Sequence, residues 1–219
     1  MKLYQLDLSP FAARVRAQLY AKGIEIPFVE PPGGLGSDAY KRINPIGKIP
    51  ALALDDGGVL PESSVIAEYL EDRFPSPSLR PVNSEDRARM RLLVQIGDQY
   101  LFPALHDLYP QVLDPKARDQ GVVDAGFARL APQYALVARF LSASGPYAAG
   151  AQLSLADTAL YPIFFFATRV HAALGGQDPT AQHTPLAAWW KCLAEHPAIQ
   201  KVDAEMTKAL AAMMAERTG

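Results

Sequence analysis

The sequence predicts an α/β unit at the N-terminus followed by an all-α unit. In the first third of the chain, short apolar segments of strand character alternate with segments of helical spacing. A stretch rich in proline and serine follows at about residue 76, and the residues beyond it show helical spacing only. We therefore predict a first domain at 1–76, a linker at 77–84 and a helical domain at 85–219.

The strands of the first unit are expected in three segments. They are KLYQL, IEIPFVE, and ALALDDGGVLP, where two short strands flank a turn at Asp56 and Gly57. Pro27 has no N–H to donate to a neighbouring strand, so the strand that contains it is expected at an edge of the sheet.

Three helices are expected between these strands and after them. AARVRAQLYAKG has helical spacing, and Gly23 stands where a helix end takes a left-handed residue. SDAYKRIN is expected as a short helix, and ESSVIAEYLEDRFP as a longer one that Pro75 ends. The order is therefore βαβ, a short helix, and ββα.

The second unit shows helical spacing in four stretches, 85–109, 117–143, 154–174 and 185–216. In LSLADTALYP, Ser154 is expected to cap the third stretch while Asp157 reaches back to the cap, as in a capping box.

Composition excludes several classes of protein. The net charge of −2 argues against a nucleic-acid binder and against a polybasic protein of the membrane surface. The most apolar run, TALYPIFFFA, is far shorter than the roughly 20 residues that span a bilayer. Cys192 is the single cysteine, so an internal disulfide is impossible and a reducing compartment is expected. The sequence thus indicates a soluble, cytoplasmic protein.

Ser9 is the first residue of chemical interest. The order βαβ–ββα is compatible with a thioredoxin-like domain, which often places a reactive group where the first strand meets the first helix. The N-terminus of a helix carries partial positive charge that favours a thiolate, and a serine hydroxyl can donate a hydrogen bond to one. Ser9 cannot itself form a disulfide, so it would act on a thiol that a substrate brings. The alternative is that Ser9 only caps the helix.

Two further segments can bind parts of a peptide-like ligand. In NPIGKIP, a cis bond before Pro50 would leave the Ile49 backbone free to pair with a ligand, and Lys48 can meet a carboxylate. In PESSVIAEYL, a helix that begins at Ser63 offers N–H groups to a carboxylate, and Glu62 can accept from an ammonium group. Their alternatives are a plain turn with a solvated lysine and an ordinary helix start.

Taken together, these segments closely resemble the cytosolic glutathione transferases. The resemblance lies in LSPFAARVRAQLYAKGIEIPFVE, NPIGKIPAL, ESSVIAEYLEDRFP, DRARMR and LSLADTALYP, in that order over nearly the whole chain. It implies a thioredoxin-like N-terminal domain with an all-α C-terminal domain, and glutathione as co-substrate without a metal. It also implies a homodimer.

The resemblance assigns roles to residues by position. Ser9 matches the serine that activates the glutathione sulfur. Ile49, before Pro50, matches the residue that pairs with the cysteinyl backbone, and Lys48 resembles the residue near the glycyl carboxylate. Glu62 and Ser63 resemble the pair that holds the γ-glutamyl end.

Some features point to a branch of this family. SPFAARVRAQLYAKGI is most similar to the tau and omega branch, with serine in place of the omega cysteine. The zeta signature Ser-Ser-Cys-Ser is absent, which argues against a maleylacetoacetate isomerase. The chain also resembles bacterial relatives that cleave aromatic ethers with glutathione.

An apolar pocket for a small hydrophobic electrophile is expected from four residues. Phe11 follows Ser9, while Phe102, His106 and Tyr109 recur at helical spacing, which is also typical of a core. The histidines show no metal-ligand spacing. Three hypotheses remain: a glutathione transferase; a glutathione-dependent lyase, isomerase or peroxidase; and a non-catalytic protein that binds glutathione.

Overall fold

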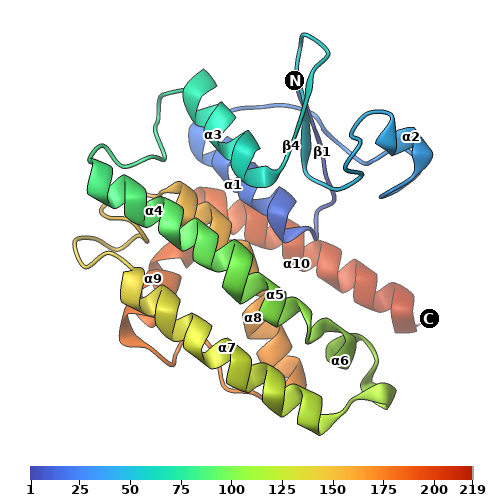
Figure 1. Cartoon of the computed structure of the whole chain (residues 1–219), viewed down its shortest axis with the longest axis vertical. Helices are drawn as coiled ribbons and strands as arrows, with labels where there is room; N and C mark the ends of the chain where they lie inside the picture. The colour runs from blue at the N-terminus through green and yellow to red at the C-terminus, as the bar shows by residue number, and fades with distance from the viewer. Residues whose placement is uncertain (219) are drawn as a thin grey trace. The chain divides into compact units, whose positions relative to one another are not determined.

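The computed structural model describes residues 1–218, which form two compact units. The first unit consists of Met1–Leu79 and the C-terminal segment from His196, and the second of Arg80–Glu195 (Figure 1). This division groups the last helix with the first unit. The domain boundaries expected from the sequence, which stay a prediction, place that helix with the second.

A mixed four-stranded sheet forms the centre of the first unit. Its strands are β1 (Lys2–Tyr4), β2 (Phe28–Val29), β3 (Ala51–Ala53) and β4 (Val59–Pro61), in the order β2-β1-β3-β4. β1 is parallel to β2 and antiparallel to β3, and β3 is antiparallel to β4. As Pro27 predicts, β2 lies at an edge.

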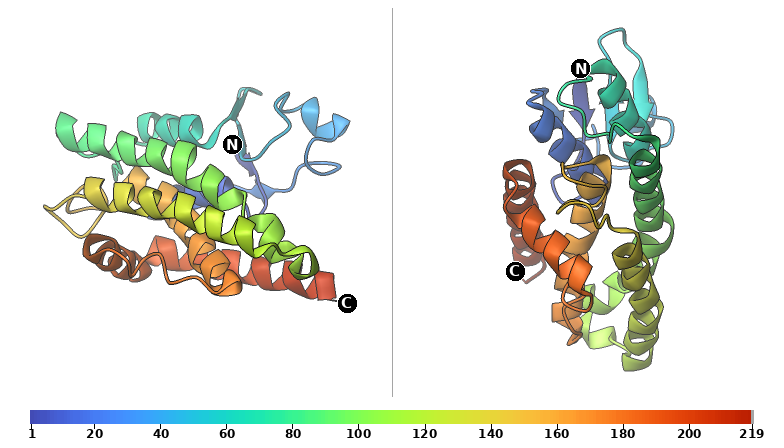
Figure 2. Two further views of the ribbon diagram at one scale, coloured as in Figure 1. Left: turned by 60° about the horizontal axis from the view of Figure 1, so that its bottom comes forward. Right: turned by 90° about the vertical axis from the view of Figure 1, so that its left-hand side faces the viewer.

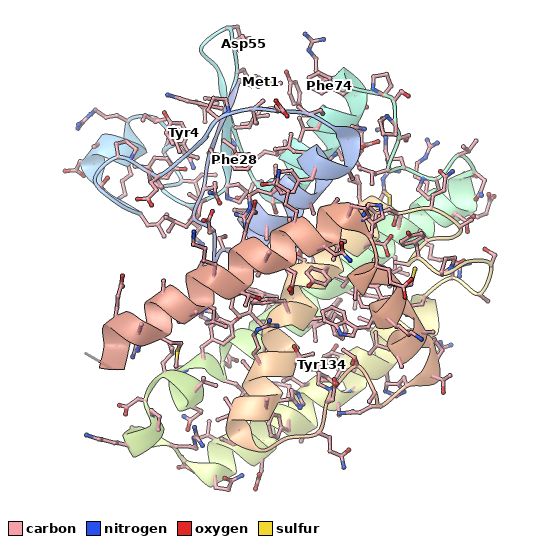
Figure 3. All side chains as sticks on the ribbon, turned by 180° about the vertical axis from the view of Figure 1, so that it is seen from behind. Met1, Tyr4, Phe28, Asp55, Phe74 and Tyr134 are labelled. Atoms are coloured by element: carbon pink, nitrogen blue, oxygen red, sulfur yellow. The ribbon has the colours of Figure 1, made fainter. Side chains whose placement is uncertain are left out.

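The helices of this unit are α1 (Pro10–Lys22), α2 (Asp38–Lys41), α3 (Ser63–Arg73) and α10 (Pro197–Thr218). The expected left-handed residue ends α1, since Gly23 has φ 65°. Apolar side chains of α1, α3, β1 and β3 make a buried core, against which Phe28 and Phe74 pack (Figure 3). The opposite surface of α1 packs against α10.

The second unit is entirely helical. Its α-helices are α4 (Ser84–Ile96), α5 (Phe102–His106), α6 (Tyr109–Leu113), α7 (Gln120–Phe140), α8 (Leu155–Leu174) and α9 (Thr184–Ala194). A π-helical turn (η1, Gly97–Leu101) joins α4 to α5, and a 3-10 turn (η2, Pro115–Ala117) precedes α7. α4 and α7 run side by side (Figure 2, left).

The prediction of one continuous helix over 85–109 is wrong, because the structure interrupts it twice. At the π turn, the Phe102 N–H reaches back to the Gly97 carbonyl. Pro103 follows directly, and a proline has no N–H to continue the regular ladder. A second interruption separates α5 from α6 at Asp107 and Leu108.

The expected helix over 185–216 is likewise two helices, α9 and α10. The break lies at Glu195 and His196, directly before Pro197. The residue before a proline disfavours helical backbone, which explains the break. The His196 Nδ1 then accepts from the Ala198 N–H at 3.2 Å and so caps α10.

The predicted capping box of α8 is confirmed. Asp157 accepts from the Ser154 N–H at 2.8 Å and from the Ser154 hydroxyl at 2.7 Å. It also accepts from the Ala148 N–H and from the Trp189 indole N–H, both at 2.8 Å. One buried carboxylate thus joins α8, α9 and the loop before α8. Over residues 1–218, no helix has the length and apolar character needed to cross a membrane.

Candidate functional site

The register of the sheet brings three of the predicted segments to one end of the first unit. Tyr4, the last residue of β1, pairs with Ala51, the first residue of β3, and Ala51 pairs with Pro61, the last residue of β4. Adjacent strands lie about 4.8 Å apart, so these three residues span roughly 10 Å. The turn toward Ser9, the residues before β3 and the residues after β4 therefore leave the sheet at the same end.

Ser9 is the N-cap of α1, as the alternative interpretation expects. Its Oγ accepts from the Ala12 N–H at 3.3 Å, and its backbone is extended at φ −73° and ψ 121°. Within the part of the chain that the structure describes, no acceptor lies against the hydroxyl hydrogen. The side chain is half-buried, and α1 is 13 residues long. The hydroxyl can therefore donate to an anion while it remains the cap.

The Ile49–Pro50 peptide is cis, as predicted. Among residues 1–218, neither backbone group of Ile49 has a hydrogen-bond partner. The carbonyl of exposed Lys48 is held from two sides, by the Asn44 amide at 2.8 Å and by the Tyr40 hydroxyl at 2.9 Å. Burial raises the pKa of Tyr40, which keeps this phenol a donor at neutral pH.

Asn44 and Tyr40 were not identified from the sequence. Asn44 lies within the quoted segment NPIGKIP, and its side chain also accepts from the Ile46 N–H at 3.2 Å. An asparagine in a proline- and glycine-rich loop is a turn former, which is the signal that could have found it. Together the two side chains fix the backbone that presents Ile49.

Glu62 has a left-handed backbone conformation, with φ 68° and ψ 115°. Among residues 1–218 it is the one residue other than glycine with a positive φ. Such a conformation costs of order 1–3 kcal/mol and is concentrated at functional sites. Glu62 is exposed at the N-terminus of α3, and the buried Ser63 begins that helix. The acidic side chain and the unpaired N–H groups of the first turn are thus adjacent.

The predicted acceptor residues fall into both units. Phe11 lies at the start of α1, with the Arg14 guanidinium 5.2 Å from its ring. In the second unit, Phe102, His106 and Tyr109 form a continuous series of ring contacts, at 5.8 Å and 5.1 Å between centroids. The Tyr109 ring also contacts Phe166 at 5.8 Å.

The Tyr109 hydroxyl is buried, and among residues 1–218 it has no hydrogen-bond partner. Burial raises the pKa of this phenol, so it stays protonated and can act as a donor. Phe102 is half-buried and His106 is exposed, so the series of rings reaches the surface of the unit. Over the described residues, no group of three metal-ligating side chains is found.

Two family models match the chain. The N-terminal domain of glutathione S-transferase matches residues 3–78, and the C-terminal domain of glutathione S-transferase matches residues 98–197.

Three curated relatives illustrate the similarity. Glutathione S-transferase Z2 of Arabidopsis thaliana is 31% identical over 91% of this chain and 89% of its own. Maleylacetoacetate isomerase of Pseudomonas aeruginosa is 29% identical over 91% of this chain and 97% of its own. Protein LigF of a Sphingobium species is 44% identical, but over 46% of this chain and 40% of its own length.

A solved structure of similar fold is a glutathione S-transferase from Methylobacterium radiotolerans in complex with glutathione sulfonate. It aligns with a TM-score of 0.74 and 25% identity, and the alignment covers 92% of this chain and 93% of the other. The predicted fold class, a thioredoxin-like domain with an all-helical domain, is thereby confirmed.

Proposed function

This chain belongs to the glutathione transferase family, and we propose that Ser9 is the residue with which this enzyme activates the glutathione thiol. The observation that carries the proposal is the free hydrogen of the Ser9 hydroxyl at the positive end of α1. A free thiol has a pKa of about 8.5 and is mostly protonated at neutral pH. A hydrogen bond from Ser9 and the field of α1 both stabilise the thiolate, which then attacks an electrophilic carbon.

We assign the remaining glutathione contacts to residues at the same end of the sheet. Glu62 accepts from the ammonium group of the γ-glutamyl end, and the first turn of α3 at Ser63 holds its carboxylate. The unpaired Ile49 backbone, before cis-Pro50, pairs with the cysteinyl backbone of glutathione. Lys48 meets the glycyl carboxylate.

The acceptor is a small hydrophobic electrophile. Phe11 on the first unit and the rings of Phe102, His106 and Tyr109 on the second supply apolar contact surface. The segment SPFAARVRAQLYAKGI supports a place near the tau and omega branch, with a serine instead of the omega cysteine. We accordingly expect no thiol-transfer activity, because that reaction needs a protein sulfur.

The test compares Ser9→Ala with Asn83→Ala. Asn83 caps α4 through a 2.7 Å hydrogen bond, so its loss controls for the loss of a helix cap. We expect Ser9→Ala to lower the turnover of an activated aryl chloride by about 10- to 100-fold, the value of a hydrogen bond to a charged group. Glutathione affinity, measured by calorimetry, should be nearly unchanged in both variants. Full turnover in Ser9→Ala would restrict Ser9 to capping.

A second candidate function is glutathione-dependent isomerisation. The similarity to maleylacetoacetate isomerase over 91% of the chain favours it, whereas the missing Ser-Ser-Cys-Ser signature opposes it. The two reactions differ in stoichiometry, because conjugation consumes one thiol for each product and isomerisation returns it. Thiol titration during turnover of maleylacetoacetate therefore distinguishes the two.

The protein is expected to act in the cytoplasm as a homodimer without nucleic-acid or membrane partners. The single cysteine and the net charge of −2 support the compartment and the absence of a polyanionic partner. Light scattering should give a particle of twice the chain mass of 23.8 kDa. A particle of single mass would contradict the dimer and leave the role of Ser9 intact.

A further inference from the structure

A fully buried guanidinium contacts the turn that leads to Ser9. Arg16 of α1 is 0% exposed. Its Nη2 donates to the Asp7 carbonyl at 2.7 Å, and its Nη1 donates to the Leu6 carbonyl at 3.4 Å and to the Gln5 side chain. One planar group therefore binds consecutive residues of the segment that connects β1 to α1.

Apart from Arg16, Gln5 holds this segment: its N–H donates to the Val29 carbonyl at 2.9 Å, and its side-chain amide donates to the Asp7 carboxylate at 2.8 Å. The Ser9 N–H donates to the Leu6 carbonyl at 3.0 Å and closes a tight turn through Asp7 and Leu8. For the Asp7 carbonyl, Arg16 is the only hydrogen-bond partner within residues 1–218. The orientation of the last peptides before Ser9 thus depends on where the guanidinium lies.

The guanidinium is in turn held by the far end of the chain. Its Nε donates to Glu205 of α10 at 2.9 Å, across a separation of 189 residues. Glu205 also accepts from the hydroxyl of Tyr20, one turn further along α1. Without Glu205 the Nε loses its hydrogen-bond acceptor, and the Asp7 carboxylate, 3.9 Å from Nη1 on the opposite side, remains to attract the guanidinium, so the removal of Glu205 should displace Arg16.

We propose that Arg16 is a positioning residue for Ser9, and that Glu205 makes the C-terminal helix part of this positioning. The inference rests on the proposed role of Ser9. Glu205 fixes the guanidinium, the guanidinium fixes the carbonyls of Leu6 and Asp7, and these set the direction of the Ser9 hydroxyl. A shift of about 1 Å in a catalytic group can cost on the order of 100-fold in rate.

A second buried ion pair on α1 provides the matched control. Lys22 and Glu71 pair at 2.9 Å with both side chains fully buried, and Lys22 lies at the opposite end of α1 from Ser9. Glu71→Gln leaves a buried lysine without its carboxylate, so it destabilises the same unit and touches none of the residues of the turn. A purely structural role of Arg16 would give the same outcome as this control.

The experiment uses the full chain with Arg16→Lys, Glu205→Ala, Glu205→Gln, Glu71→Gln and Ser9→Ala. For each we would measure the thermal midpoint, the glutathione affinity by calorimetry, and the pKa of the bound thiol from its thiolate absorbance. Arg16→Lys keeps the charge but loses the fork that binds two carbonyls. Glu205→Gln keeps an acceptor for Nε, whereas Glu205→Ala removes it.

We expect Arg16→Lys and Glu205→Ala to raise the pKa of the bound thiol by about one unit and to lower kcat about tenfold, with glutathione affinity nearly unchanged. Glu205→Gln, which keeps the acceptor for Nε, should have a thiol pKa close to that of the wild type. Glu71→Gln should lower the thermal midpoint alone. Because Glu205 is partly exposed, its variants keep the test decisive if Arg16→Lys does not fold.

The inference is overturned if Arg16→Lys and Glu205→Ala behave like Glu71→Gln while Ser9→Ala raises the thiol pKa. If Ser9→Ala leaves that pKa unchanged, the proposed role of Ser9 fails and this inference fails with it.

Discussion

Asp157 completes the capping box of α8 and Asp119 is the N-cap of α7, but Asp157 is fully buried and Asp119 is exposed. Asp157 accepts four hydrogen bonds, and its loss leaves buried donors on Ser154, Ala148 and Trp189 unpaired. Asp119 accepts from two backbone N–H groups that water can also satisfy. An aspartate at the start of a helix therefore makes contributions of different size, depending on whether it is buried or exposed.

We expect Asp157→Ala to lower the free energy of unfolding by about 3 kcal/mol or more, because each orphaned buried group costs about 1–3 kcal/mol. Asp119→Ala should cost about 1 kcal/mol, the value of an exposed cap. Urea denaturation followed by tryptophan fluorescence measures both, since Trp189 and Trp190 lie in the second unit. Equal losses would show that burial does not decide the value of the cap.

At the scale of elements, a buried ion pair joins α1, α3 and the segment after α3. Glu71 of α3 accepts from Lys22 at 2.9 Å, from Gln18 at 3.0 Å and from the Leu79 N–H at 3.0 Å. Lys22 also donates to the Pro77 carbonyl at 2.6 Å. The arrangement satisfies both charges, and its cost is the removal of both from water.

Glu71→Ala should therefore lower the free energy of unfolding by about 3–5 kcal/mol, because it leaves the buried Lys22 unpaired. The double variant Lys22→Met with Glu71→Leu should lose less, since it removes both charges and fills their volume. Thermal unfolding followed by circular dichroism tests this order. A double variant less stable than Glu71→Ala would mean that the attraction exceeds the desolvation cost.

The elements that the sequence predicts are those whose cause is local. Ser9 as a possible cap, Gly23 as a left-handed helix end and Pro27 as an edge residue each act through their own backbone chemistry. The break before Pro197 was also readable from the chain, because His196 precedes a proline, but the apolar spacing continues across it. The apolar spacing alone therefore predicted one helix where the structure has two.

The contacts with distant causes could not be predicted. Arg16 and Glu205 pair across 189 residues, and no spacing rule connects them. The left-handed backbone of Glu62, between β4 and α3, could not be predicted either, because a glutamate carries no sequence signal for a positive φ. The candidate site could be predicted from the sequence because its segments, from Ser9 to Ser63, lie in one short unit.

At the scale of the whole molecule, the dependence of stability on pH should contain a contribution from a buried histidine. His171 of α8 is 4% exposed, stacks on Phe127 at 4.4 Å, and its Nε2 lies 3.1 Å from the Tyr134 hydroxyl. Burial lowers the pKa of His171, and the charge of Asp178 opposes this only in part. Burial lowers the pKa of His196 as well.

A lowered pKa in the folded state means that the unfolded chain takes up the proton first as the pH falls. The contribution of His171 to stability is therefore fully present above the unfolded pKa of about 6.5 and decreases as the pH falls below it. The slope for one histidine reaches at most about 1.4 kcal/mol per pH unit.

We expect His171→Gln to reduce this slope relative to His183→Gln, a histidine substitution at the N-cap of α9. Urea midpoints measured from about pH 7.5 to about pH 5 test this. Carboxylate titration is common to both variants, so identical slopes would exclude His171 as the source and leave His196 as the remaining candidate.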